Sequence, residues 1–100
     1  MFCSVDLVID SARHSVTLAD NEINLTATEY RILCYLALNA GRVVTPDHIL
    51  KMVWGEEYVG DTHLLQVNMT RLRQKLQDNC RNPRYILTRP GIGYMMVKGT

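Results

Sequence analysis

Apolar and polar residues alternate along the first part of the chain. Residues 5–9 and 14–18 are rich in β-branched side chains, and the segment between them has the composition of a turn. Residues 22–24 have the character of a third short strand. The pattern predicts a small antiparallel sheet at the N-terminus, preceded by residues 1–3 as a chain end or the remnant of a linker.

Helical spacing replaces this alternation at Thr26. A threonine is a preferred N-cap, and Glu29 three residues later completes a capping box. Apolar side chains then recur at intervals of three and four residues until Asn39-Ala40-Gly41 supplies a stop signal. A helix is therefore predicted over residues 26–39.

A second helix is predicted between Thr45 and Gly55. Thr45 is suited to the N-cap and Pro46 to the first helical position. Apolar side chains form its buried stripe, and Trp54 at its end is expected in the core. Residues 55–60, which contain two acids and one tyrosine, are expected to form a loop.

The third predicted helix, over residues 61–76, has two different faces. Apolar side chains at i, i+4, i+7 and i+11 form a buried stripe, namely Leu65, Met69, Leu72 and Leu76. The opposite face is a continuous line of mostly polar side chains, namely His63, Gln66, Val67, Thr70, Arg71 and Gln74.

Two further strands, residues 85–88 and 94–97, are predicted after a polar turn at residues 78–83. Residues 89–93 join them with one proline and two glycines, which is typical of a β-hairpin. The Gly-Ile-Gly in this segment indicates turn geometry and not a phosphate cradle, because no helix follows it. The complete order is strands, three helices and a hairpin, which predicts one domain over residues 1–100.

Composition and charge narrow the class of protein. The chain has 100 residues, of which 47% are hydrophobic, enough for one small core. No apolar run is long enough for a membrane span and no secretory signal is visible, so we expect a cytoplasmic protein. The net charge is only +1, but the last 50 residues carry eight basic and four acidic side chains. This asymmetry fits a face that binds a polyanion, although a solvated helix face gives the same count.

Motifs typical of catalysis are absent from the sequence. The histidines are isolated in different elements, namely His14, His48 and His63. We therefore expect no enzyme, no metal site and no cofactor. The cysteines form no Cys-x-x-Cys pair and are interpreted as free thiols, with Cys34 in the core, namely Cys3, Cys34 and Cys80.

The polar face of the third helix has the chemistry of base recognition. Glutamine suits adenine, arginine suits guanine, and threonine suits either. Val67 either packs on a thymine methyl group or is half-buried against a neighbour, and the sequence favours neither. Arg71, Arg73 and Lys75 suit phosphate contacts, although cations also stabilise the C-terminal end of any helix. Arg89 in the hairpin turn can reach a minor groove.

Five stretches of the chain occur in a characteristic order, namely residues 25–33, 39–45, 53–55, 68–76 and 89–94. Together they resemble the effector domains of OmpR/PhoB-type response regulators, and most closely the KdpE branch. The resemblance covers nearly the whole chain. It implies an α+β winged helix-turn-helix fold, with a four-stranded N-terminal sheet, three helices and a C-terminal β-hairpin wing. It also implies a parent chain with a phosphoryl-accepting receiver domain, which these residues do not include.

The resemblance implies that the third helix enters a major groove and the wing reaches the adjacent minor groove. Base-reading positions fall on His63, Gln66, Val67, Thr70 and Arg71. Phosphate contacts fall on Asn68 and Arg73, to which the charge pattern adds Lys75, and wing contacts fall on Thr88 and Arg89.

Two departures from the family pattern concern these positions. Some members have arginine where this chain has His63 and Thr70, so a different DNA sequence is expected. Pro90 stands where the best-known members have a wing arginine, and Arg89 can substitute for it.

The resemblance also implies partners. Double-stranded DNA is expected to bind two copies on direct repeats, whereas the isolated domain is expected to be a monomer. RNA polymerase is expected at the loop that contains Glu56, Glu57 and Tyr58. The alternative is a solvated loop that contacts no partner. The alternative function is a winged-helix protein–protein interaction module, whose docking face should carry aromatic or aliphatic anchors.

Overall fold

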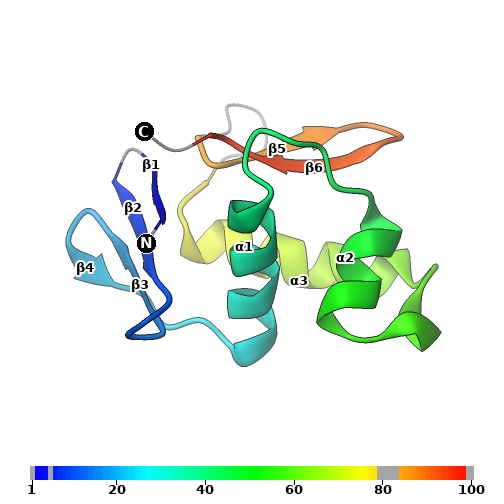
Figure 1. Ribbon diagram of the computed structural model, residues 1–100, viewed down its shortest axis with the longest axis horizontal. Helices are drawn as coiled ribbons and strands as arrows, with labels where there is room; N and C mark the ends of the chain where they lie inside the picture. The colour runs from blue at the N-terminus through cyan, green and yellow to red at the C-terminus, as the bar shows by residue number, and fades with distance from the viewer. Residues whose placement is uncertain (1, 5, 79–83, 99–100) are drawn as a thin grey trace.

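Strands open and close the chain, and three α-helices lie between them (Figure 1). The computed structural model describes residues 2–4, 6–78 and 84–98. Its elements are β1 (Phe2–Ser4), β2 (Leu7–Asp10), β3 (Ser15–Leu18), β4 (Asn21–Glu22), α1 (Ala27–Leu38), α2 (Pro46–Val53), the short 3-10 helix η1 (Glu56–Tyr58), α3 (Thr62–Lys75), β5 (Ile86–Arg89) and β6 (Gly93–Met96). Cys80 and most of the predicted polar turn lie outside the described residues.

The N-terminal sheet is antiparallel, with its four strands in chain order. Leu7, Ile9 and Val16 are buried because successive side chains of a strand point to opposite faces. A turn joins β2 to β3, and the Asp10 carboxylate accepts a hydrogen bond of 3.1 Å from the backbone N–H of Ala12. The predicted antiparallel sheet is therefore confirmed.

Strand β1 is the part of this sheet that the sequence pattern does not predict. Phe2 pairs with Ile9 and Cys3 with Val8 along β2. Phe2 and Cys3, interpreted from the sequence as part of a chain end or linker remnant, therefore lie in a strand of this sheet. Three residues are too few to display a period of two, so pairing with β2 defines this strand and no local pattern does.

Side-chain caps define where α1 and α2 begin. The Thr26 hydroxyl accepts from the backbone N–H of Glu29 at 3.1 Å, and the Glu29 carboxylate accepts from the backbone N–H of Thr26 at 3.0 Å. Thr45 caps α2 by accepting from the backbone N–H of His48 at 3.3 Å, and Pro46 is the first helical residue. Both predicted helix starts, including the capping box, are confirmed.

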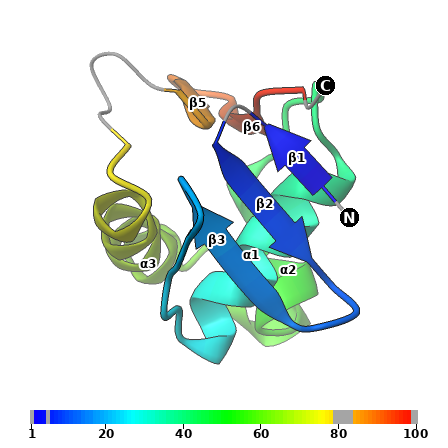
Figure 2. The ribbon, with the colours of Figure 1, turned by 90° about the vertical axis from the view of Figure 1, so that its left-hand side faces the viewer.

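The three helices and the N-terminal sheet share one hydrophobic core. Leu65, Met69 and Leu72 of α3 are at most 2% exposed, and Leu76 just after the helix is fully buried. Trp54 packs against the same core, as expected. Figure 2 shows the sheet lying across α1 with α3 alongside. The core therefore holds α3 by one face and leaves the opposite face outside.

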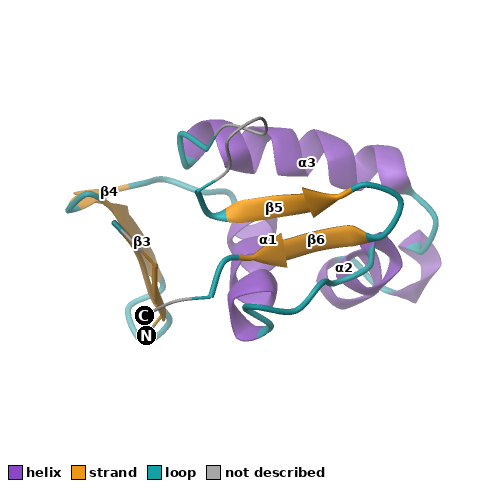
Figure 3. Cartoon of the chain, turned by 90° about the horizontal axis from the view of Figure 1, so that it is seen from above, coloured by secondary structure: helices purple, strands orange, loops and turns teal. Residues whose placement is uncertain are grey.

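The C-terminal hairpin, β5 and β6, lies beside α3 (Figure 3). Its strands are displaced by one residue from the predicted ranges. The backbone of Val44 donates to the Tyr94 carbonyl at 2.7 Å and accepts from the Tyr94 N–H at 2.9 Å, which attaches the hairpin to the α1–α2 link. A side chain at position 93 would overlap the Val44 carbonyl, so only Gly93 fits. The α+β winged helix-turn-helix fold is confirmed.

Candidate nucleic-acid interface

Helix α3 presents its outer face to solvent along its length. The Asp61 carboxylate caps the helix by accepting from the backbone N–H of Leu64 at 3.3 Å. Four of the side chains predicted to read bases are exposed and one is half-buried, namely His63, Gln66, Thr70, Arg71 and the half-buried Val67. The structure therefore brings all of these positions together on one surface.

Their polar groups are not used inside the described part of the chain. Among the described residues, the α3 side chains that form hydrogen bonds or ion pairs are those of Asn68, Arg73 and Lys75. Val67 does not pack against the core, unlike its neighbour Leu64. The outer face thus offers free donors, free acceptors and one apolar side chain.

All three side chains predicted to contact phosphate have partners within the chain. The Asn68 amide donates to the Leu64 carbonyl of its own helix at 2.9 Å. Arg73 contacts the wing, and Lys75 contacts α1. The charged groups of Arg73 and Lys75 therefore already have partners within the chain, and their phosphate contacts stay predictions.

Lys75 joins the C-terminal end of α3 to the start of α1. Its ammonium donates to the Glu29 carboxylate at 2.6 Å, and Glu29 is only 1% exposed. Burial alone would raise the pKa of Glu29, but hydrogen bonds from Lys75 and from the Thr26 backbone outweigh it, so this pKa is lowered. The two residues are 46 positions apart, so no local pattern could have revealed the pair.

Arg73 extends from α3 to both strands of the wing. Its guanidinium donates to the Ile86 carbonyl at 3.0 Å and to the Thr88 hydroxyl at 2.6 Å, both on β5. The same guanidinium lies over the ring of Tyr94 on β6, 5.9 Å from its centroid. Thr88, predicted as a wing contact to DNA, is thus the acceptor of an internal bond.

The wing ends in a tight turn that exposes one cation and one apolar side chain. The backbone N–H of Ile92 donates to the Arg89 carbonyl at 2.9 Å, and Gly91 has a φ of 77°. Proline before such a glycine is typical of a type II turn, which confirms the turn interpretation. Arg89 is exposed, and Ile92 is 60% exposed. Arg89 is therefore placed where it can meet a ligand that lies across the wing.

A hollow of about 350 Å³ connects α3 with the wing. It is lined by residues from the start of α2, from α3 and from the wing turn, among them Pro46, Gln66, Thr88, Arg89 and Ile92. Because Gln66 belongs to the outer face of α3, that face and the wing form one continuous surface.

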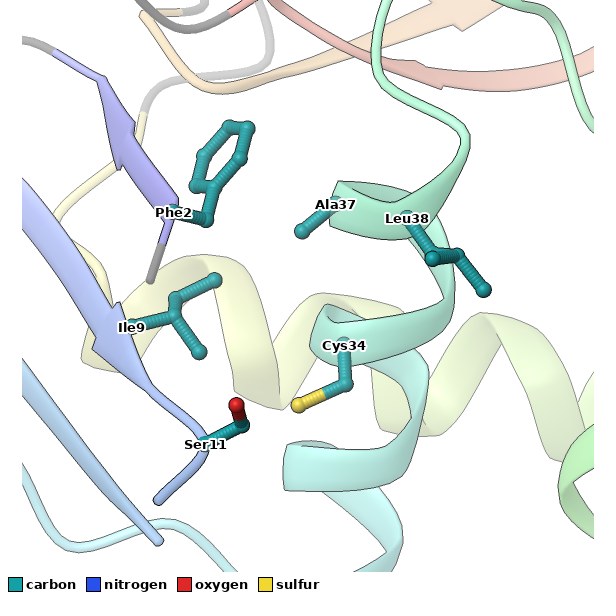
Figure 4. A pocket seen from close by; sticks show the side chains of 6 residues that line it. All are labelled: Phe2, Ile9, Ser11, Cys34, Ala37 and Leu38. Atoms are coloured by element: carbon teal, nitrogen blue, oxygen red, sulfur yellow. The ribbon is translucent and has the colours of Figure 1, made fainter. Parts of the chain in front are cut away.

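A second hollow, of about 470 Å³, lies between the N-terminal sheet and α1 (Figure 4). Phe2 and Ile9 from the sheet face Cys34 and Ala37 of α1 across it. Among its described lining residues, the polar side-chain groups are the Ser11 hydroxyl and the Cys34 thiol, which do not form a set of convergent polar groups. We therefore take α3 and the wing as the candidate site.

The loop predicted to contact polymerase is partly ordered as η1. Glu56, Glu57 and Tyr58 are all exposed. The Asp47 carboxylate accepts from the backbone N–H of Gly60 at 3.1 Å, which ties the end of the loop to α2. The loop therefore displays two acids beside the start of α3.

The described ranges also bear on metal binding and membrane insertion. Within residues 2–4, 6–78 and 84–98, no three His, Cys, Asp or Glu side chains could hold a metal ion. Across the same ranges no helix is both long and apolar enough to span a bilayer. Cys3 and Cys34 are free thiols, and Cys34 is partly buried against the core.

Comparison with known proteins matches this geometry to one family. The family model described as "Transcriptional regulatory protein, C terminal" matches residues 20–96. The DNA-binding domain of Klebsiella pneumoniae RstA, solved in complex with the RstA box, is 32% identical with a TM-score of 0.86, covering 94% of this chain and 93% of that one. The DNA-binding domain of Escherichia coli CpxR is 30% identical with a TM-score of 0.80, covering 100% and 99%.

A longer protein matches equally well over the same region. Thermotoga maritima DrrB, a response regulator described as an OmpR/PhoB homolog, is 36% identical with a TM-score of 0.83. The match covers 93% of this chain but 42% of DrrB, so this chain corresponds to less than half of that protein. The chain belongs to the family of C-terminal domains of transcriptional regulatory proteins, as an OmpR/PhoB-type DNA-binding effector domain of response regulators.

Proposed function

We propose that this domain binds double-stranded DNA sequence-specifically, with α3 in the major groove and the wing at the adjacent minor groove. The observation that carries the proposal is the outer face of α3, whose polar side chains have no partner among the described residues, opposite a face that is buried in the core. A major groove about 12 Å wide admits a helix of this kind. The 14 residues of α3 span roughly 21 Å, enough for several base pairs.

The proposed base readers follow the donor and acceptor pattern of the groove. Gln66 suits the two-point pattern of adenine, and Arg71 suits guanine. Thr70 and His63 can contact several bases, and Val67 suits a thymine methyl group. Because Gln66 lines the hollow toward the wing, we place its base nearest to the wing-bound minor groove.

Phosphate contacts must come largely from groups that the chain leaves free. Asn68 has a second amide N–H beyond the one bound to Leu64, so we keep it as a proposed phosphate contact. Arg89 supplies the cation of the wing turn, and Ile92 adds apolar surface there. Apolar side chains commonly pack in minor grooves. Thr88 and Lys75 are given no direct DNA role in this proposal.

Assembly and partners are proposed from the family resemblance. Two copies of a monomeric domain would occupy direct repeats about 10 base pairs apart. The loop with Glu56, Glu57 and Tyr58 would meet RNA polymerase, and a receiver domain of a parent chain would control both events in the cytoplasm. Assignment to the KdpE branch rests on the sequence stretches alone.

A salt titration tests the DNA-binding proposal. The domain should bind a mixed-sequence duplex at low salt, and log K should fall linearly with log salt at about −0.9 per phosphate contact. A protein-interaction module would give no binding, or binding that ignores salt. Either result would reject the proposal.

A further inference from the structure

We propose that Arg73 is a positioning residue that fixes the wing relative to α3. This inference rests on the proposed DNA binding, because its functional consequence is the distance between two groove-reading elements. Its structural basis is independent of DNA.

The first support is the number of wing elements that one guanidinium touches. Arg73 starts on α3, bonds to a backbone carbonyl and a hydroxyl of β5, and covers the ring of Tyr94 on β6. A planar guanidinium can donate in its plane and stack on a ring with its face, which a lysine ammonium cannot do. The contact therefore depends on arginine geometry and not on charge alone.

The second support is the burial of the same group. Arg73 is half-buried, and its Nε is buried with no partner among the described residues. Both wing bonds come from its Nη2 atom, at 2.6 Å to the Thr88 hydroxyl and 3.0 Å to the Ile86 carbonyl, so both hydrogens of that nitrogen are used. Hydrogen bonds from a charged donor are among the stronger ones in proteins, so these two bonds hold the wing against α3.

The third support is how the wing is attached. A two-stranded hairpin has marginal stability alone and takes its orientation from its attachments. The Val44–Tyr94 backbone pair anchors β6 to the α1–α2 link, and the Val97 N–H donates to the Tyr85 carbonyl at 2.8 Å at the base. Among the described residues, Arg73 is the α3 side chain that forms hydrogen bonds to the wing. It therefore sets the spacing between α3 and the wing turn.

The test uses Arg73→Lys, which keeps the charge, and Arg73→Met, which keeps the apolar stem. Each is titrated with a duplex that the unaltered domain has selected from random DNA and with a mixed-sequence duplex of equal length. We expect both variants to lose about tenfold in affinity for the selected duplex, the size of one lost base contact. The affinity of Arg73→Lys for mixed DNA and its salt slope should stay close to those of the unaltered domain.

A side chain that only contacts phosphate gives a different signature. Arg73→Lys would then bind like the unaltered domain, while Arg73→Met would lose affinity for both duplexes and about 0.9 of the salt slope. That outcome overturns the inference. If the unaltered domain binds neither duplex, the proposed function itself fails, and the two failures remain distinguishable.

Amide hydrogen exchange in the free domain tests whether Arg73 fixes the wing, without DNA and with a substitution that leaves Arg73 in place. Thr88→Val removes the wing acceptor and keeps the arginine, so exchange in β5 and β6 should accelerate while the α3 core stays protected. Arg71→Met is the matched control, because Arg71 is exposed on the same helix and touches no wing residue among the contacts described. Unchanged wing exchange in Thr88→Val overturns the inference even if the Arg73 variants fail to fold.

Discussion

Replacing Lys75 with methionine should destabilise the domain. The substitution removes the ammonium that bonds to Glu29 at 2.6 Å and keeps most of the apolar stem. Glu29 is 1% exposed, so its carboxylate would stay buried. It would keep one hydrogen bond, which it accepts from the backbone N–H of Thr26. Loss of one partner of a fully buried pair costs about 3–5 kcal/mol.

The exposure of Lys75 reduces this figure. Its side chain is 37% exposed, so water reaches the pair and partly solvates the abandoned carboxylate. We therefore expect a loss of about 2 kcal/mol in the free energy of unfolding at pH 7, near the value of one hydrogen bond to a charged group. Urea unfolding followed by circular dichroism measures it.

The loss should depend on pH with a defined sign. The pKa of Glu29 is lowered in the folded state, so the ion pair contributes stability above the unfolded value of about 4.5 and loses it as pH falls through the folded pKa. In Lys75→Met, burial without the ammonium raises that pKa. The difference between the two proteins should therefore be largest near neutral pH and shrink below about pH 4.

A double-mutant cycle supplies the control. Glu29→Gln keeps an oxygen that can accept from the Thr26 N–H. The double variant has no buried charge at this site, so its loss in the free energy of unfolding should be smaller than the sum of the two single losses. Additive losses, a Lys75→Met loss below about 0.5 kcal/mol, or a loss that persists unchanged at low pH would refute the reasoning.

The remaining predictions concern the attachment of the wing. Gly93→Ala should cost about 3 kcal/mol in urea unfolding, because a side chain there forces apart the Val44–Tyr94 backbone pair. Gly91→Ala, at a φ of 77° in open space, should cost only about 1 kcal/mol, and equal losses would contradict the close-approach argument. Asp78→Ala should cost about 2–4 kcal/mol, because the buried carboxylate accepts from the backbone N–H groups of Arg84 at 2.7 Å and Ile86 at 3.0 Å. Asp10→Ala, which removes two exposed bonds of the same kind, should cost less than about 1 kcal/mol, and a reversed order would contradict the account.

Local signals in the sequence predict most of the elements of the fold. The capping box at Thr26 and Glu29, the N-cap at Thr45 and the apolar stripe of α3 each act within a few residues, so the sequence displays them directly. The base-reading positions followed from the same periodicity, because removal of the buried stripe leaves the outer face.

Contacts between distant residues could not be predicted in this way. Arg73 and Lys75 are cations near a helix C-terminus, where a phosphate role and a dipole effect have the same local pattern. Their actual partners are 13 to 46 positions away in sequence, so only the packing of α3 against the wing and α1 reveals them. Strand β1 is similar, because its existence depends on pairing with β2.

Selection of binding sites from random DNA, carried out in parallel with the unaltered domain and Gln66→Ala, tests the central claim that the outer face of α3 reads bases. We expect a defined consensus for the unaltered domain. Gln66→Ala should lose preference at about one position, at the end of the α3 contact nearest the wing, and keep the others. An identical consensus from both proteins, or no consensus from the unaltered domain, would contradict it.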